Sequence, residues 1–170
     1  EKEARSLDWV CIPTGIGSHS RIAIDCLKRG LQTLVEKPLA PVLQEVDAIQ
    51  KAEREASIVA SVGFQHTYVE DTWQIKKRLL EGAIGKIQRV DCLGLWPRSQ
   101  DYYERNEWAG QISVRGSWIL DSPFQNGLSH LVNLILFWLG DTMDSRAKLE
   151  RVSAEVYRVK SIESYDTVRT

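Results

Sequence analysis

Three groups of polar side chains stand where the surrounding pattern is apolar, and the first lies in the segment LVEKPLA. Glu36, Lys37 and Pro38 follow directly on an apolar run that ends at Val35. A lysine held in a cleft at a strand end can polarise a carbonyl or lower the pKa of a bound hydroxyl. The alternatives are a solvated ion pair, a proline at the first position of a helix, and the plain start of a loop. Successive strand residues point to opposite faces, so the two charged side chains should diverge.

The second group is the segment PTGIGSH, residues 13–19. Gly15 and Gly17 have the spacing of a dinucleotide-binding loop, but the third glycine of that loop is absent, so the signal is weak. The segment can be explained as a tight turn with Ser18 or His19 near the start of a helix. It can also be functional, because parallel sheets bind ligands at the carboxyl ends of their strands. In that case His19 faces the crevice.

The third group lies in an otherwise apolar segment, SPFQNGLSHLVNLILFWLG. Asn126, His130 and Asn133 fall at helical spacing and form one polar stripe. A histidine of near-neutral pKa that lines a cleft is the usual general acid or base. The alternative is a histidine whose ring nitrogens are satisfied in a seam between helix and sheet. Asp121 lies just before the segment. Its carboxylate either caps the helix and orients its neighbours, or reaches the site itself.

The same segment carries the signals of a helix over residues 123–139. Ser122 can be the N-cap, whose side chain accepts a backbone N–H of the first turn. Pro123 suits the first position of the helix, and Gln125 completes a capping box. Gly140 ends the pattern.

Predicted strands and helices alternate through the first half of the chain, and these elements would position the three groups. Apolar runs bounded by turn residues predict strands, and apolar residues three and four apart predict helices. This order predicts a parallel sheet with right-handed crossovers and strands buried on both faces. The predicted strands are 8–14, 31–38 and 57–64, and the predicted helices are 19–30, with Gly30 as its C-cap, and 39–56.

After Gly63 the rhythm changes, which predicts a second domain of the α+β class with an open, mainly antiparallel sheet. The domains expected are residues 1–65 and 66–170. Four aromatic residues are candidate walls of a substrate cleft, or packing groups of a sheet surface or subunit interface: Trp96, Tyr102, Tyr103 and Trp108. The elements predicted are a helix over 69–80, a strand over 86–96, the helix over 123–139 and strands in the tail, 148–170.

Composition excludes several classes of function. A net charge of -1 gives no reason to expect nucleic acid or an acidic membrane as a partner. The longest apolar run, residues 134–139, is far too short to span a bilayer. Cys11, Cys26 and Cys92 form no CxxC pair, so we expect core thiols in a reducing compartment, the cytoplasm, and no metal site.

The three groups together, in this order, resemble the glucose–fructose oxidoreductase and inositol dehydrogenase family (Gfo/Idh/MocA). The resemblance covers nearly the whole chain, through DWVCIPTGIGSH, GLQTLVEKPLA, ASVGFQH, LLEGAIGKIQRV and NGLSHLVNLILFWLG. It implies an NAD(P)-binding Rossmann domain followed by an α+β domain that binds substrate and forms homo-oligomers through its sheet. It also implies hydride transfer between NAD or NADP and a hydroxyl or carbonyl carbon of a sugar, polyol or related small molecule.

The resemblance also assigns roles to residues. Lys37 of the EKP segment would contact nicotinamide ribose and substrate, His130 would be the general base, and the Lys37–Pro38 peptide would be cis. The catalytic set is completed by Asn126, where the family commonly has an aspartate, and by Asp121 as an alternative carboxylate. The expected cofactor-binding residues are Pro13, Thr14, His19, Glu36, Lys37, Pro38 and Gln65.

Two features of that family are missing from the sequence: the GxGxxG phosphate loop and an acidic residue near the end of the second strand. The first strand also begins almost at the first residue. We therefore expect a fragment of a longer protein, with weak or no binding of NAD or NADP by the fragment and no activity of its own. The alternatives are a non-catalytic ligand-binding or dimerisation module and, within the same fold, a redox-assisted glycosidase.

Overall fold

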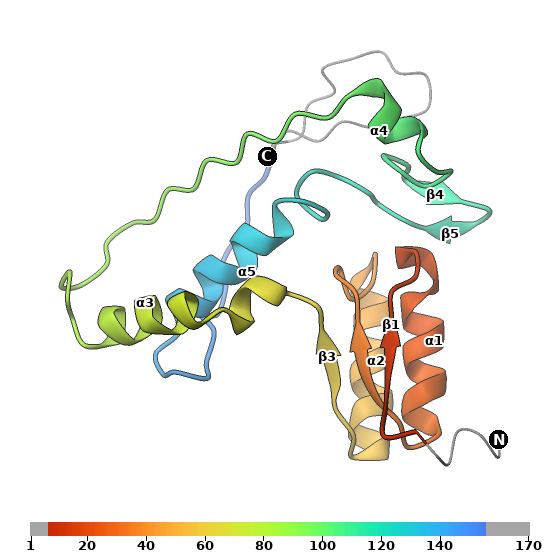
Figure 1. Ribbon diagram of the computed structural model, residues 1–170, viewed down its shortest axis with the longest axis horizontal. Helices are drawn as coiled ribbons and strands as arrows, with labels where there is room; N and C mark the ends of the chain where they lie inside the picture. Colours follow the sequence, from red (N-terminus) through yellow and green to blue (C-terminus); the bar gives the residue numbers. More distant parts are fainter. Residues whose placement is uncertain (1–6, 156–170) are drawn as a thin grey trace.

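The computed structural model describes residues 7–155 and shows a three-stranded parallel sheet followed by a helical part and an extended segment (Figure 1). The sheet has the order β1–β2–β3, and β2 pairs in parallel with both neighbours. Its elements are β1 (Trp9–Ile12), α1 (Ile16–Lys28), β2 (Gln32–Val35), α2 (Leu43–Ala56) and β3 (Ala60–Val62). The predicted βαβαβ unit is therefore confirmed, with elements a few residues shorter than the sequence pattern indicated.

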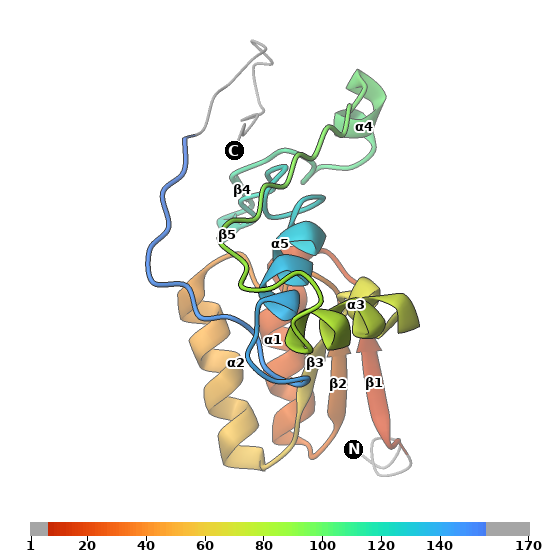
Figure 2. The same ribbon diagram turned by 90° about the vertical axis from the view of Figure 1, so that its left-hand side faces the viewer.

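Both crossover helices pack against each other on one face of this sheet (Figure 2). The core fills the space between that face and the helices, and its members are Ile12, Ala23, Leu27, Val35, Ala40, Ile49 and Ala52. The opposite face is open, so the prediction of strands buried on both faces is wrong for the described part. Trp9 and Cys11 are exposed there, since alternate residues of β1 point away from the helices.

The cysteines also depart from the expectation of core thiols. Cys11 and Cys92 are exposed and Cys26 is half-buried; all three are free. Burial raises the pKa of the Cys26 thiol, which lies in α1. Within residues 7–155 no group of three or more metal-ligating side chains could hold a metal ion.

Gly30 ends the first helix of this unit, α1, as the sequence indicated. Gly30 has a φ of +79° and donates its N–H to the carbonyl of Leu27 at 2.9 Å, which closes α1. The Lys37–Pro38 peptide is cis, as the family resemblance implied.

The second part begins with a 3-10 turn, η2 (Gln65–Tyr68), and its main helices are α3 (Glu70–Leu80) and α5 (Ser129–Trp138), which lie side by side (Figures 1 and 2). One indole N–H joins α5 to α3, and another joins α3 to η2. Trp73 donates to the carbonyl of Thr67 at 2.7 Å, and Trp138 donates to that of Thr72 at 3.1 Å. None of the helices in residues 7–155 is long and apolar enough to cross a bilayer.

The predicted strand over residues 86–96 does not form in the described part of the chain. These residues run as an extended segment from the end of α3 to α4 (Gln100–Glu104), without a pairing partner among residues 7–155 (Figure 1). A strand pattern needs a neighbouring strand, and none is placed beside this one. The antiparallel pairing observed is a small hairpin of β4 (Ser113–Val114) and β5 (Ser117–Trp118). Of the predicted tail strands, residues 148–155 are not strand, and the rest lie outside the described residues.

The predicted helix over residues 123–139 begins later than expected, at Ser129. Ser122 does accept the N–H of Gln125 at 3.1 Å, but the Gln125 side chain donates to the carbonyl of Pro41 rather than back to Ser122. Half of the capping box therefore forms, and residues 123–128 make turns in place of a first helical turn.

Gly140, which follows α5, is required for a reason other than backbone conformation. A Cβ at this position would overlap the carbonyl group of Ser145, because the loop after the helix folds back against it. Gly140→Ala is therefore expected to lower the free energy of unfolding by about 1–3 kcal/mol. Chemical denaturation measures this difference. The matched control is Gly15→Ala, whose added Cβ would meet only ordinary contacts at 3.7 Å or more, and an equal loss in both variants would contradict the expectation.

Candidate functional site

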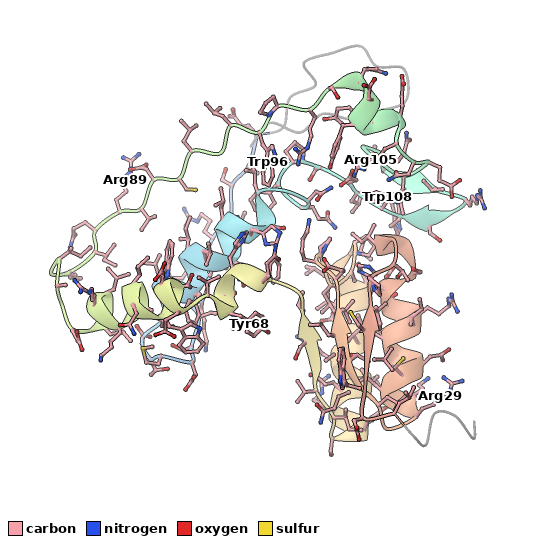
Figure 3. The ribbon with its side chains drawn as sticks, viewed as in Figure 1. Arg29, Tyr68, Arg89, Trp96, Arg105 and Trp108 are labelled. Atoms are coloured by element: carbon pink, nitrogen blue, oxygen red, sulfur yellow. The ribbon has the colours of Figure 1, made fainter. Side chains whose placement is uncertain are left out.

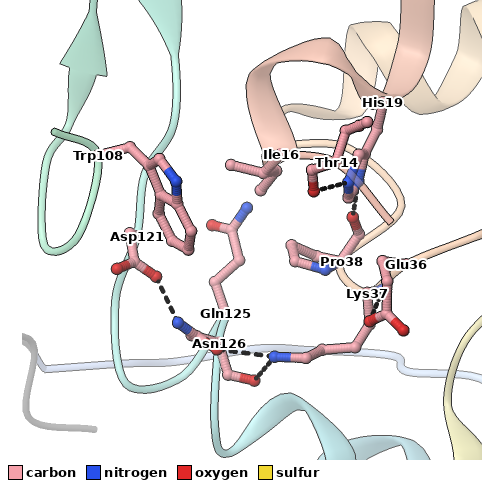
Figure 4. A pocket seen from close by; sticks show the side chains of 10 residues that line it. All are labelled: Thr14, Ile16, His19, Glu36, Lys37, Pro38, Trp108, Asp121, Gln125 and Asn126. Carbon is pink, nitrogen blue, oxygen red and sulfur yellow. Dashed lines mark hydrogen bonds between the residues drawn. The ribbon is translucent and has the colours of Figure 1, made fainter. Parts of the chain in front are cut away.

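The site lies at the carboxyl edge of the parallel sheet, where the loops after β1 and β2 face the turn before α5 (Figure 4). This is the edge at which open parallel sheets bind ligands. The loops enclose a cavity of about 220 Å³, lined by Thr14, Ile16, His19, Glu36, Lys37, Pro38, Trp108, Asp121, Gln125 and Asn126.

Lys37 crosses from the sheet to the second part of the chain. Its Nζ donates to Oδ1 of Asn126 at 2.7 Å and to the backbone carbonyl of the same residue at 3.0 Å (Figure 4). An ammonium has three N–H donors, so one remains for a ligand in the cavity. Burial lowers the pKa of Lys37, although the carboxylates of Glu36 and Asp121 oppose the shift.

The two charged residues of the EKP segment diverge, as strand geometry predicted. Glu36 lies near the end of β3, with Oε1 3.2 Å from the position that a Cβ on Gly63 would take. Its other oxygen accepts the backbone N–H of Lys37 at 3.2 Å. Glu36 therefore supports the backbone at Lys37 while the lysine side chain reaches across the cavity.

Asn126 is fixed by partners on its other side. Its Nδ2 donates to Oδ1 of Asp121 at 2.9 Å and lies 3.2 Å from the hydroxyl of Tyr102. The second oxygen of Asp121 accepts the backbone N–H of Gly110 at 2.7 Å. The amide of Asn126 is thereby oriented with its oxygen toward Lys37, and the carboxylate of Asp121 acts on the lysine through the asparagine.

His19 holds two loops together at the wall of the cavity. Its ring nitrogens lie 2.9 Å from the carbonyl oxygens of Thr14 and Pro38, and its side chain is 1% exposed. These contacts join the loop after β1 to the loop after β2. His19 lines the cavity as predicted, but both ring nitrogens already have partners, so its contribution is the shape of the wall.

His130 lies in the first turn of α5, outside the residues that line the cavity. Its ring makes edge contacts with the rings of His66 and Phe64, at centroid distances of 4.7 and 5.8 Å. Its Nδ1 is buried without a hydrogen-bond partner among the described residues. Burial first, and then the positive charges of Lys37 and His66, lower the pKa of His130.

The polar stripe of the sequence connects three parts of the structure. Asn126 binds Lys37, while Asn133 donates to Oγ1 of Thr67 at 2.8 Å, and His130 lies between them along the chain. The stripe therefore faces the sheet and η2, which is the side where the site lies.

Five of the seven expected cofactor-binding residues line the cavity, and two do not. Pro13, directly after β1, and Gln65, the first residue of η2, are exposed and lie outside the lining. Of the candidate aromatic walls, Trp108 lines the cavity, and Tyr102 contacts it through Asn126. The sequence reasoning missed Ile16 and gave Gln125 only a capping role. The position of Ile16, between the two glycines of the turn, was the available signal.

The size and lining of the cavity determine how much of a nicotinamide cofactor fits in it. Backbone loops, a spare ammonium N–H and an indole face suit a flat polar ring or a sugar. Its volume lies below the range of about 300–1,000 Å³ that encloses drug-sized ligands. The residues present therefore fit the nicotinamide end of a dinucleotide or a substrate ring, and not the whole dinucleotide.

Comparisons with known proteins bear on the fold that carries this cavity. Residues 2–64 match the family model described as "Oxidoreductase family, NAD-binding Rossmann fold". Levoglucosan dehydrogenase of Pseudarthrobacter phenanthrenivorans is 29% identical over 72% of this chain and 30% of its own length. The NAD(+)-dependent scyllo-inositol 2-dehydrogenase of Bacillus subtilis is 32% identical over 49% of this chain and 25% of its own length.

Among solved structures, the WlbA dehydrogenase of Chromobacterium violaceum, in complex with NADH and UDP-GlcNAcA, aligns with a TM-score of 0.67 and 30% identity. The alignment covers 78% of this chain and 36% of that one. The chain thus spans about a third of the length of the relatives that it matches. Its residues 2–64 are similar to the Gfo/Idh/MocA family of oxidoreductases, which has an NAD-binding Rossmann fold.

Proposed function

We propose that the protein transfers hydride between NAD or NADP and a hydroxyl or carbonyl carbon of a sugar, polyol or related small molecule. The single observation that supports this best is the bond of Lys37 to Asn126 across the cavity at the carboxyl edge of the sheet. It joins the NAD-binding fold to the second part of the chain and leaves one N–H for a substrate oxygen. The relatives that act on levoglucosan and inositols favour a polyhydroxylated substrate.

Each residue of the site has a role in this proposal. Lys37 holds the reacting oxygen through an N–H donor and stabilises negative charge that develops on it. Asn126 and Asp121 orient the ammonium. His130 is the general base that takes the hydroxyl proton when the substrate is oxidised and returns it in the opposite direction. The cofactor, when bound, supplies the hydride acceptor or donor.

The domain division proposed is residues 1–65 for cofactor binding and 66–170 for substrate binding and homo-oligomer formation. The change from a parallel sheet to paired helices at η2 supports a boundary there. In this division Lys37 comes from the first domain and Asn126 from the second, so both are required to complete the site.

The experiment that tests the proposed function is an assay of the whole protein with a panel of sugars and polyols and both nicotinamide cofactors. Reduction of the cofactor by at least one member of the panel is the expected result. Tight binding of cofactor and sugar without turnover would instead support a non-catalytic ligand-binding module. The observation that favours this second candidate is Asn126, which cannot hold a proton or a charge where the family commonly has an aspartate.

The 170 residues alone are expected to bind the dinucleotide weakly or not at all, because the cavity that they form is smaller than such a ligand needs. Calorimetric titration of the 170-residue chain with NAD and NADP measures this. A dissociation constant in the nanomolar-to-micromolar range would contradict the expectation. The whole protein serves as the comparison.

A further inference from the structure

Aromatic rings and arginine side chains alternate beside the cavity. The guanidinium carbon of Arg98 lies 4.6 Å from the ring centroid of Trp96 and 4.3 Å from that of Tyr102. That of Arg105 lies 3.5 Å from the Tyr102 ring and 5.2 Å from the Trp108 ring. We call these five residues the arginine–aromatic stack. Trp96, Arg105 and Trp108 are labelled in Figure 3, in the part of the chain that faces the carboxyl edge of the sheet.

The stack is continuous with the site at three points. Trp108 lines the cavity, and the hydroxyl of Tyr102 lies 3.2 Å from Nδ2 of Asn126. At its other end, a Cβ on Gly127 would lie 3.1 Å from the Trp96 ring and 3.8 Å from Nη2 of Arg98. The residue after Asn126 must therefore be small to let these two side chains lie against the turn that binds Lys37.

The guanidinium groups of this region are not paired among the described residues, although the carboxylates of Asp101 and Glu104 lie on α4, between the two arginines in the chain. Within residues 7–155 neither Arg98 nor Arg105 forms an ion pair with a carboxylate. Together with Lys37 they place three cations near the cavity, whose own carboxylates are Glu36 and Asp121. Both arginines act to lower the pKa of Lys37, which shows that their charges reach it. Negative charge in the cavity would therefore be stabilised.

The geometry of a stacked guanidinium explains how that charge would be bound. A guanidinium whose faces lie on aromatic rings keeps its N–H donors in its plane, where they match the two oxygens of a carboxylate or phosphate. Arg105 uses one Nη1–H for the carbonyl of Tyr102 at 2.7 Å, and its other donors remain. Stacking also restricts the side chains, so less conformational entropy is lost when the ligand binds.

We propose that the substrate carries an oxyanion, a carboxylate or a phosphate ester, next to its polyhydroxylated ring, and that Arg98 and Arg105 bind this group while Trp108 packs on the ring. This inference rests on the proposed function, which supplies the reacting alcohol of the sugar or polyol. It adds the anionic class of the substrate and the residues that select it.

The test is calorimetric binding to the whole protein, saturated with NAD(P)H, of three matched ligands: a neutral aldose, the corresponding uronic acid and the corresponding sugar phosphate. The wild-type protein is expected to prefer one or both anions over the neutral sugar by about 10- to 100-fold, the effect of a charge-assisted hydrogen-bond pair. Whichever anion binds more tightly identifies the group. Equal affinity for all three ligands, or binding of none, overturns the inference.

Arg98→Gln and Arg105→Gln are expected to reduce the anion-to-neutral affinity ratio by the same factor. The control is Arg29→Gln. Arg29 is the exposed residue that directly follows α1, at the far end of the sheet unit from the cavity (Figure 3), and this variant should keep the wild-type ratio. An equal loss of affinity for charged and neutral ligands would show that the stack is only structural and would overturn the proposal.

If either variant fails to fold, the salt dependence of wild-type binding decides instead. Added NaCl should weaken binding of the anion and not of the neutral sugar, and parallel behaviour of both overturns the inference. Turnover, measured separately, distinguishes the two proposals. Selective anion binding without turnover contradicts the proposed function alone, whereas turnover of neutral and charged sugars with equal affinity contradicts only the anionic substrate.

Discussion

Lys37→Met in the whole protein is expected to lower kcat by roughly 10²- to 10⁴-fold, the range for removal of a group that acts on the reacting proton or oxygen. Methionine keeps the apolar length of the side chain but removes the N–H donors, including the one that is not used by Asn126. The oxygen that the substrate presents would then face a thioether. Steady-state rates with the best substrate of the panel measure the effect.

The matched control for this variant is Lys28→Met, at the exposed last residue of α1. A normal rate is expected there. Fluorescence titration of bound NAD(P)H distinguishes a loss of chemistry from a loss of cofactor binding. If both the Lys37→Met and the Lys28→Met variants convert substrate at the wild-type rate, the assignment of Lys37 to the reaction is wrong.

His130→Gln is expected to lower kcat by a similar factor and to remove the acid limb of the pH–rate profile. Only the neutral imidazole can accept a proton. Because burial and the charges of Lys37 and His66 lower its pKa, the wild-type rate should fall only below the ordinary histidine value of about 6.5. As pH decreases through the lowered pKa, the base becomes protonated and the rate is lost.

His66→Gln provides an independent check of this assignment. His66 is exposed, and its ring lies 4.7 Å from the ring of His130 without lining the cavity. Because His66 lowers the pKa of His130, its removal should move the acid limb to higher pH, toward the unperturbed value. An acid limb above about pH 6.5 in the wild-type protein, or a full rate in His130→Gln, would show that another group is the base.

The sheet unit was predictable because its signals are local. Apolar spacing and the glycine after α1 define a strand or helix within a few residues, and consecutive strands joined by short crossovers are usually neighbours in a parallel sheet. The second part depends on contacts that the pattern does not contain. Residues 86–96 were predicted as a strand, yet strand formation requires a partner. The capping signals before α5 were satisfied in part by Pro41, far away in the chain.

The residues that line the candidate site were predictable in part, but their contacts were not. Lys37, Asn126 and Asp121 line the cavity and could be selected because charged and amide groups are costly in apolar surroundings unless they are paired or used, whereas His130, selected for the same reason, lies outside the lining. That Lys37 binds Asn126, 89 residues later, follows only from the way the second part returns to the sheet. The spacing of residues within one segment carries no information on such a contact, and the stacking of Arg98 and Arg105 was missed for the same reason.

The extended segment between α3 and α4 has a consequence for amide hydrogen exchange. From residue 86 to residue 98 no backbone N–H donates to a backbone carbonyl within residues 7–155, while Leu93 and Leu95 are each 82% exposed. In the 170-residue chain these amides should exchange with deuterium almost as fast as in an unstructured peptide. Wherever another strand comes to lie beside this segment, alternate amides should become protected, so mass spectrometry of peptides from this segment would report the completion of a sheet residue by residue.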